Sequence, residues 1–191
     1  MTLLRSRLLS VVLPLALSLA GASCTEPLAP PEPGDVLFEV EYLNFAWVPT
    51  WQGFVVEADG EVYAYDLGDT TRQWPPEDDD FSAAELAAKY AHGRRLVRAV
   101  SPTEVSSMYS RVDFALAGTV TPPLGVCFDA GIVRYSALLF DGSTGTYHRV
   151  LLHQRGDVAR TNTAPAAREM YQWLAGVTAT GADLGICDPN A

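Results

Sequence analysis

The feature that most constrains the fold is the dipeptide Asp59-Gly60, which lies between two strand-like segments. Residues 54–58 and 61–67 flank it, and the side chains of the second segment alternate between two faces, which is the period of a β-strand. Asp-Gly is well suited to the type I′ turn of a hairpin, whose two central residues both need positive φ. The pattern therefore predicts an antiparallel β-hairpin, and the fold has to include at least this piece of sheet.

Further segments carry the signals of strands. In residues 36–43, apolar side chains alternate with a mixed set that contains Glu39 and Glu41, so this segment is predicted to be a strand with one apolar face. Residues 132–140 and 146–154 flank a loop rich in turn-forming residues, and this arrangement predicts a second hairpin.

Two helices are predicted from the residues at their N-termini. Ser82 and Glu85 have the spacing of a capping box, in which each side chain bonds a backbone N–H group at the start of the helix. Ser101 and Glu104 repeat this spacing, and the apolar residues that follow at helical intervals predict one continuous helix as far as Gly118.

Strand and helix signals come in separate blocks, in the order strands, two helices, strands and a last helix over residues 164–176. Such blocks, joined by hairpins, are typical of α+β folds with an antiparallel sheet. We therefore expect an antiparallel sheet of two hairpins plus an N-terminal strand, with three helices packed mainly on one face. Residues 35–191 are enough for one domain with a substantial core, and a single domain is predicted.

The first residues have the composition of an export signal. Arg5 and Arg7 are followed by a mainly apolar run of 13 residues and then by small residues. This run is shorter than the roughly 18 residues that a membrane-spanning helix needs, and Pro14 lies within it. Residues 1–23 are therefore predicted to be a signal peptide.

The residues LAGASC, which end at Cys24, resemble the bacterial lipobox, in which a small residue precedes a cysteine that becomes lipid-modified. The resemblance implies a lipoprotein with palmitate or a similar acyl chain on Cys24. Because Thr25 follows in place of an aspartate, it also implies the outer membrane of the cell envelope, with the leaflet left open. The alternative is ordinary signal-peptidase cleavage near Ala22, with Cys24 left as a thiol. Residues 24–34 contain four prolines and are predicted to form an extended tether.

The chain has three cysteines. If lipid occupies Cys24, Cys127 and Cys187 remain as an even pair in an oxidising compartment, where disulfide bonds form. A bond between them would close a loop of about 60 residues and stabilise the fold by about 4 kcal/mol in the chain-entropy model. The alternative is two buried or free thiols. Neither cysteine has a CxxC partner or a neighbouring histidine, so no metal site is expected at them.

The chain is acidic, with a formal net charge of −10 and a single lysine, Lys89. This balance makes nucleic acid and anionic membrane surfaces poor partners.

The sequence contains no GxSxG nucleophile turn, no HExxH zinc motif and no glycine-rich phosphate loop. The acidic run 77–80 lacks the glycine turn and distal glutamate of an EF-hand loop, so a solvated loop is favoured over a calcium site. No cofactor and no metal are expected.

An aromatic group near the end of the first strand supplies candidate binding residues. Trp47 and Trp51 flank Pro49, so their rings are expected near a loop, where they could stack on sugars or on a protein partner. The alternative is that these rings close one end of the core. His148 is the third candidate, because period two places it on the same face as Val150 in a partly buried strand.

The leading hypothesis is a non-enzymatic cell-envelope lipoprotein that presents a binding domain to a protein or a wall polymer and reaches the membrane through its N-terminal lipid. It rests on the predicted anchor and tether and on the missing catalytic motifs. One alternative is a cell-wall or polysaccharide hydrolase that uses Asp66, Asp69 or Asp129 with His148. Another is an immunity or inhibitor lipoprotein that masks a basic partner. Leader, tether and compact acidic domain together resemble small bacterial lipoproteins, which implies a location and no activity.

Overall fold

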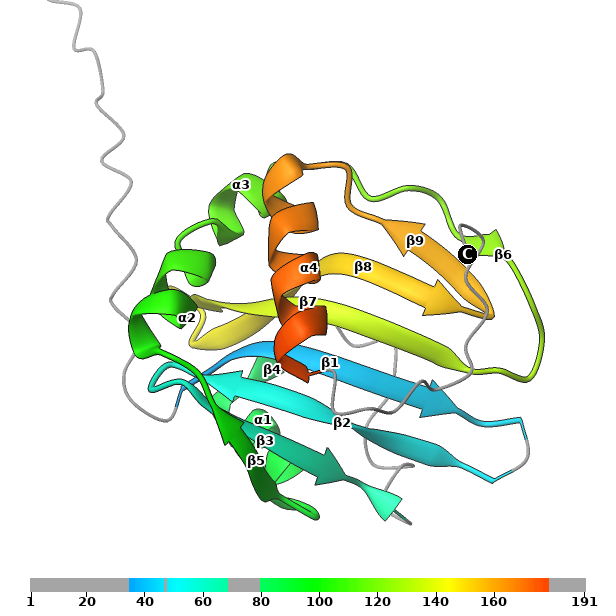
Figure 1. Cartoon of the computed structure of the whole chain (residues 1–191), viewed down its shortest axis with the longest axis horizontal. Helices are drawn as coiled ribbons and strands as arrows, with labels where there is room; N and C mark the ends of the chain where they lie inside the picture. Colours follow the sequence, from blue (N-terminus) through cyan, green and yellow to red (C-terminus); the bar gives the residue numbers. More distant parts are fainter. Residues whose placement is uncertain (1–34, 47, 69–79, 179–191) are drawn as a thin grey trace, which may run out of the picture.

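The computed structural model describes residues 35–46, 48–68 and 80–178 (Figure 1). The predicted leader and tether lie outside these ranges. So do four of the residues singled out from the sequence, which are Cys24, Trp47, Asp69 and Cys187.

Within the described residues the chain forms nine strands and four helices. The strands are β1 (Val36–Asn44), β2 (Thr50–Glu57), β3 (Glu61–Asp66), β4 (Asp80–Ser82), β5 (Arg95–Ala99), β6 (Leu124–Gly125), β7 (Ile132–Asp141), β8 (Thr146–Gly156) and β9 (Val158–Thr161). The helices are α1 (Ala83–Ala91), α2 (Pro102–Tyr109), α3 (Val112–Leu116) and α4 (Pro165–Thr178).

The strands pair in the order β5-β3-β2-β1-β7-β8-β9-β6, and β4 pairs with β8 beside this path. Every one of these pairs is antiparallel. The two predicted hairpins are β2–β3 and β7–β8, and the N-terminal strand β1 lies between them. The predicted α+β class with an antiparallel sheet is thereby confirmed.

The hairpin at Asp59-Gly60 forms, but its predicted turn type is wrong. Gly60 has a φ of +90°, whereas Asp59 is not among the positive-φ residues of the described chain. The N–H of Gly60 donates to the carbonyl of Glu57 at 2.9 Å, and the N–H of Glu61 donates to Oδ1 of Asp59 at 3.0 Å. The connection is therefore a three-residue loop with glycine in the left-handed position, in place of a two-residue type I′ turn.

Helices lie on both faces of the sheet (Figure 1). Helix α4 crosses β8, β7 and β1 on one face, and α2 and α3 lie beside it, whereas α1 and β4 lie behind the sheet. The predicted continuous helix up to Gly118 is divided at Arg111 into α2 and α3. The capping box of Ser82 and Glu85 forms, but the side chain of Ser101 makes no capping hydrogen bond.

Each face of the sheet carries its own apolar core. The core under α2, α3 and α4 contains Phe38, Val40, Val56, Val133, Met170 and Leu174. The core under α1 contains Leu43, Trp51, Val55, Tyr65, Leu86 and Tyr90. Because β1 lies in the middle of a sheet that is covered on both sides, its second face is buried as well. One face of β1 is apolar, as predicted. The other face, which carries Glu39 and Glu41, is buried too, so these two glutamates lie in the interior.

The strands β4, β5 and β6 have no counterpart among the predicted elements. They are two to five residues long and lie at or beside the edges of the sheet. In β5, for example, four of the five residues are exposed. Short, exposed edge strands carry little of the apolar alternation that identifies a strand in a sequence.

Candidate functional site

The most unusual feature of the interior is a network of buried charges behind the sheet. Glu39 and Glu41 of β1 meet Lys89 of α1, and the lysine Nζ lies 2.6 Å from Oε1 of Glu39 and 2.7 Å from Oε1 of Glu41. Arg149 of β8 donates from Nη2 to Oε2 of Glu39 at 3.3 Å. The four side chains are at most 4% exposed. Opposite charges at these distances offset the large cost of removing each ion from water.

Neutral donors complete this buried network. The hydroxyl of Tyr65 donates to Oε1 of Glu39 at 2.7 Å, and the indole Nε1 of Trp51 donates to Oε1 of Glu41 at 2.8 Å. The ammonium of Lys89 also lies 5.1 Å from the centroid of the Trp51 ring. Trp51 is 1% exposed, so it does not offer the open stacking surface considered for it. The alternative interpretation, in which these rings close one end of the core, describes Trp51.

Electrostatics keep Glu41 ionised. Burial by itself raises the pKa of Glu41, but Lys89, Arg149 and Arg134 together outweigh burial and hold this pKa at about 2. Burial raises the pKa of the Tyr65 hydroxyl well above its ordinary value, so Tyr65 acts as a neutral donor. Glu39, Glu41 and Lys89 line neither of the two cavities described next, although Arg149 lines one of them and Tyr65 lines the other. We therefore assign the ion pairs of Lys89 with the two glutamates to the stability of the fold.

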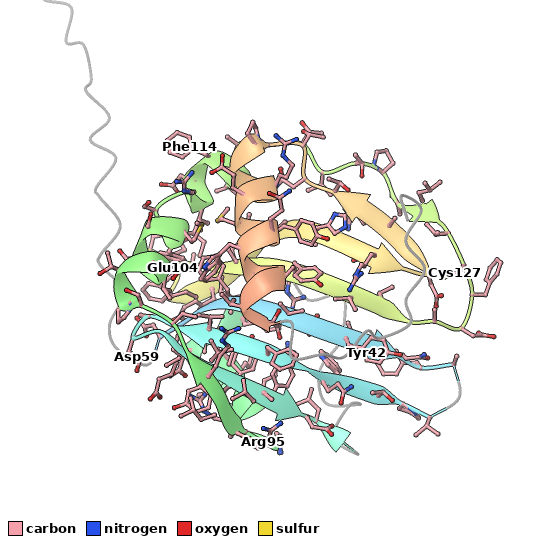
Figure 2. All side chains as sticks on the ribbon, viewed as in Figure 1. Tyr42, Asp59, Arg95, Glu104, Phe114 and Cys127 are labelled. Atoms are coloured by element: carbon pink, nitrogen blue, oxygen red, sulfur yellow. The ribbon has the colours of Figure 1, made fainter. Side chains whose placement is uncertain are left out.

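A cleft of about 720 Å³ lies beside α4 on the opposite face of the sheet, and we call it the α4 cleft. It lies where α4, which packs mainly over β8, β7 and β1, leaves part of the same face over β2, β3 and β5 uncovered. The lining includes five aromatic rings, two arginines and one glutamine, which are Tyr42, Phe54, Tyr65, Tyr135, Tyr171, Arg95, Arg155 and Gln52. Tyr42 and Arg95 are labelled in Figure 2. The volume is within the range of small-ligand sites.

Contacts with neighbouring residues, and between two of the rings themselves, hold the rings of the α4 cleft in place. The hydroxyl of Tyr42 donates to the carbonyl of Ala130 at 3.3 Å and accepts from Nδ2 of Asn44 at 3.2 Å. The rings of Tyr135 and Tyr171 meet edge to face with centroids 4.9 Å apart. Rings that are positioned before a ligand arrives lose little conformational entropy on binding. Among the described residues that line the cleft there is no aspartate, glutamate or histidine.

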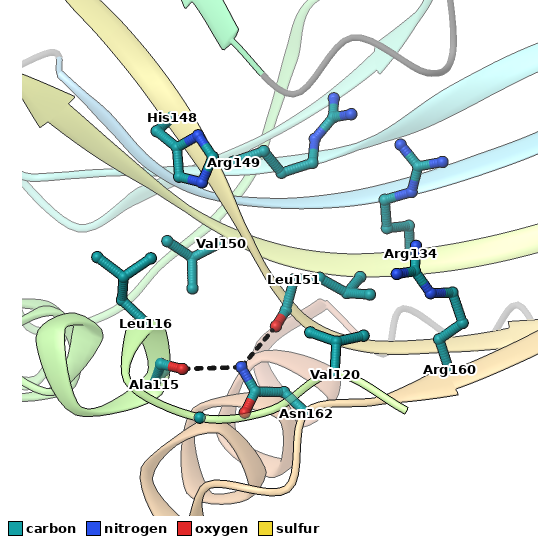
Figure 3. Close-up of a pocket in the computed structure, with 11 residues that line it drawn as sticks. Ala115, Leu116, Val120, Arg134, His148, Arg149, Val150, Leu151, Arg160 and Asn162 are labelled. Atoms are coloured by element: carbon teal, nitrogen blue, oxygen red, sulfur yellow. Dashed lines mark hydrogen bonds between the residues drawn. The ribbon is translucent and has the colours of Figure 1, made fainter. Parts of the chain in front are cut away.

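A second cavity, of about 340 Å³, is lined by three arginines and one histidine, and we call it the arginine pocket (Figure 3). Its basic residues are Arg134 of β7, His148 and Arg149 of β8, and Arg160 of β9. His148 is the candidate that the sequence singled out, and it is half-buried. Its Nδ1 lies 2.7 Å from Oδ1 of Asp80, which β4 places directly opposite.

The residues considered for a hydrolase are spread over the molecule. Asp66 is the last residue of β3, and His148 lies in β8, with β2, β1 and β7 between these strands. At about 4.8 Å per strand, the two strands are about 19 Å apart. Asp129 lies in the loop before β7, where its φ is 63°. None of these groups lines the α4 cleft.

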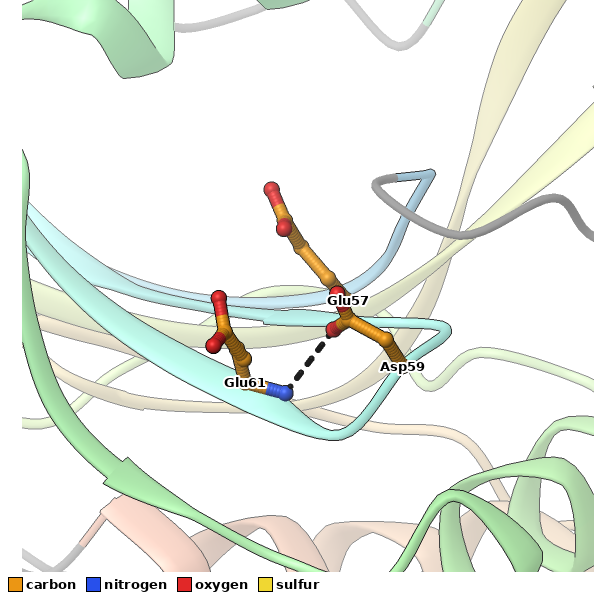
Figure 4. A group of neighbouring side chains, drawn as sticks. All are labelled: Glu57, Asp59 and Glu61. Atoms are coloured by element: carbon orange, nitrogen blue, oxygen red, sulfur yellow. Dashed lines mark hydrogen bonds between the residues drawn. The ribbon is translucent and has the colours of Figure 1, made fainter.

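Three carboxylates at the β2–β3 hairpin lie within 4.8 Å of one another, namely those of Glu57, Asp59 and Glu61 (Figure 4). Each of them has a partner in the described structure. Glu57 pairs with Arg94, Glu61 accepts a hydrogen bond from the hydroxyl of Tyr63, and Asp59 accepts from the backbone of Glu61. These contacts explain the cluster as part of the hairpin.

Cys127 is disulfide-bonded. It lies in the loop between β6 and β7. Because Cys187 lies outside the described residues, its pairing with Cys127 stays a prediction.

Among the helices of the described ranges, none combines the length and apolar composition required to span a bilayer. In comparisons with known proteins, no family model, no curated protein and no solved structure matches this chain. The interpretation of its function therefore rests on the geometry of the cavities and on the sequence.

Proposed function

We propose that this chain is a non-enzymatic cell-envelope lipoprotein whose domain binds a wall polysaccharide in the α4 cleft. The observation that carries the proposal is the composition of the cleft, in which aromatic rings and side-chain donors occur together and the described lining holds no aspartate, glutamate or histidine. Aromatic faces pack against the apolar faces of sugar rings, and the rings of Tyr42, Phe54 and Tyr171 supply such surfaces.

The polar groups of the α4 cleft suit the rim of a sugar. Arg95 and Arg155 donate hydrogen bonds only, and Gln52 both donates and accepts, so together they match hydroxyl and carboxylate groups. A mainly apolar cavity with a few polar groups is the usual form of a small-ligand site. These features favour a glycan over a flat protein surface as the occupant.

The same composition argues against the hydrolase alternative. Glycosidases place two carboxylates about 5 to 10 Å apart around the bond that breaks. The described lining of the α4 cleft supplies none, and the strands that carry Asp66 and His148 are separated by three others. A binding role without catalysis is therefore the better supported proposal.

The predicted tether fits this role. An extended segment over residues 24–34 would reach about 34 Å at about 3.1 Å per residue. The described domain begins at Asp35, directly after that segment. A domain held at this distance from a membrane could reach a polymer layer above the lipid surface.

Co-sedimentation with purified, insoluble cell wall tests the proposal. Two variants change the α4 cleft with little effect on packing: Phe54→Leu keeps the apolar volume without the ring, and Arg95→Ala alters an exposed side chain. Both should bind roughly tenfold more weakly than the unchanged chain. The matched control is Phe114→Leu, because Phe114 is 70% exposed on α3 and does not line the cleft.

Thermal unfolding of each variant shows whether it is folded. The proposal is wrong if folded Phe54→Leu and Arg95→Ala chains bind the wall as well as the unchanged chain does. It is also wrong if the unchanged chain does not sediment with the wall at all.

A further inference from the structure

We propose that the arginine pocket is a second binding site, and that it takes an oxyanion of the size of a phosphate group. This inference is independent of the α4 cleft, because the two cavities share no lining residue. It rests on the origin of the cavity, on the balance of charge around it and on the side chain of Arg160.

The pocket originates from an interruption in the pairing of β8. Along the edge of β8, β4 pairs with residues 146–148, whereas β9 pairs only with His153 and Gln154. The residues between these two stretches have no strand partner on this side. Asn162 occupies part of the gap, and its Nδ2 donates to the carbonyls of Leu151 at 3.0 Å and Ala115 at 2.9 Å. Asn162 thus links β8 to α3 and forms one wall of the cavity.

The charge around the pocket is positive, although the chain as a whole carries a net charge of −10. No carboxylate is among the described residues that line it. Figure 3 shows Arg134, Arg149 and Arg160 extending from three neighbouring strands to the same side. An anion placed among these guanidinium groups would reduce the repulsion between them.

The carboxylates that contact the lining residues are already paired: Asp80 lies 2.7 Å from Nδ1 of His148, and Glu39 and Glu41 belong to the buried network behind the pocket. Glu41 lies 3.5 Å from Nη1 of Arg134, while Glu39 lies 3.3 Å from Nη2 of Arg149. Both glutamates also bind Lys89, so two carboxylates in this group face three cations. The network therefore holds the two arginines in position and leaves a positive balance toward the cavity.

Arg160 supplies a donor that has no partner in the described structure. Its Nε is buried and makes no hydrogen bond. Because Nε has almost no accessible surface, a ligand would meet Arg160, which lines the pocket, through the accessible part of its side chain. The planar fork of an arginine matches the oxygens of phosphate, sulfate or carboxylate groups in a bidentate manner. Phosphate has the charge and the number of acceptors to bridge several such forks.

The test is anion binding by the chain expressed with its leader and carrying Cys24→Ala, so that lipid does not interfere. Thermal unfolding is followed with inorganic phosphate, sulfate or acetate at constant ionic strength. We expect a saturable rise in Tm that is largest with phosphate. In Arg160→Gln the apparent Kd for phosphate should rise roughly tenfold or more.

The matched control is Arg168→Gln, because Arg168 is an exposed arginine on α4 outside the pocket. This control should bind phosphate as the unchanged chain does. If Arg160→Gln does not fold, Arg160→Lys keeps the charge without the planar fork and should also weaken binding.

The proposal is overturned if all three anions act equally without saturation, or if Arg160→Gln binds phosphate like Arg168→Gln.

A second arm identifies the source of the oxyanion. Glycerol 3-phosphate represents a soluble phosphomonoester, and phosphatidylglycerol vesicles represent a lipid headgroup. Arg160-dependent binding of either supports the site and assigns the source. If neither glycerol 3-phosphate nor the vesicles bind, and inorganic phosphate has no effect on Tm, the proposed oxyanion site is rejected.

Discussion

The ammonium of Lys89 lies 2.6 Å from Oε1 of Glu39, although the two residues are 50 positions apart and both are buried. This pair joins α1 to the central strand β1 across the interface behind the sheet. Because the chain has no other lysine, its one ammonium group is placed where no water solvates it. The interface therefore depends on matched charge as well as on apolar packing.

Replacing Lys89 by methionine should destabilise the fold by roughly 3 to 5 kcal/mol, because it leaves a buried carboxylate without its cation. Urea unfolding measures this loss. The control is Arg111→Met, which breaks the exposed pair of Arg111 with Glu169 and should cost about 1 kcal/mol or less. Adding Glu41→Gln to Lys89→Met should recover part of the loss, because Glu39 then retains Arg149. Equal effects of the two single substitutions would contradict the role assigned to Lys89.

Stability should fall in acid through Glu41. Its pKa is held at about 2 in the folded chain, below the ordinary value of 4.5. A lowered pKa stabilises the folded state above the unfolded-state value, so this contribution is lost as the pH falls from about 5 toward 2. It amounts to something on the order of 3 kcal/mol. Urea unfolding at several pH values should show a shallower dependence in Glu41→Gln, and an unchanged dependence would rule the effect out.

The two predicted capping boxes should respond differently to substitution. The Oγ of Ser82 accepts from the N–H of Glu85 at 3.2 Å, whereas Ser101 makes no side-chain cap bond. Ser82→Ala should therefore cost about 1 kcal/mol, and Ser101→Ala a few tenths. Chemical denaturation compares the two. A larger loss for Ser101→Ala would mean that its cap forms in solution.

The disulfide at Cys127 should contribute about 4 kcal/mol if it closes the predicted loop of about 60 residues to Cys187. Peptide mapping without reductant should recover these two cysteines in one linked fragment. Cys127→Ser and Cys187→Ser should then lower the free energy of unfolding by the same amount. The double variant should lose no more than either single variant, because each substitution alone removes the bond. Recovery of Cys127 linked to Cys24 would contradict both the predicted pairing with Cys187 and the predicted lipid on Cys24.

Lipidation at Cys24 is tested by metabolic labelling with palmitate. The unchanged chain should carry the label and partition with membranes, whereas Cys24→Ala should be unlabelled and recovered in the soluble envelope fraction. Label that persists in Cys24→Ala would place the acyl chain elsewhere, and an unlabelled wild-type chain would favour ordinary signal-peptidase cleavage.

Local signals in the sequence predicted much of the fold correctly. Asp59-Gly60 located the first hairpin, and Ser82 with Glu85 located the start of α1. Such signals depend on hydrogen bonds between residues a few positions apart, so the surrounding fold changes them little. Even so, the turn type at Asp59 was wrong, because the register of the two strands sets the length of the loop.

The candidate sites were less accessible to prediction. Trp51 lies next to the loop between β1 and β2, as expected, yet its ring is buried, because α1 covers this part of the sheet. The rings and arginines of the α4 cleft come from six strands and one helix. No spacing in the sequence indicates that α4 stops short of β2 and leaves this part of the sheet open.

Turns, caps and strand periodicity follow from contacts within one segment, and for this reason the sequence predicts the hairpins, the helix starts and the α+β class. Which strand is central and which face is covered depend on pairings such as Phe38 with Ala137, about a hundred residues apart. Alternation along β1 is the same whether Glu39 and Glu41 face water or a second layer. Only the packing of α1, with the one lysine of the chain, places these glutamates in the interior, and only the pairing of β7, β8 and β9 brings three arginines together around one pocket.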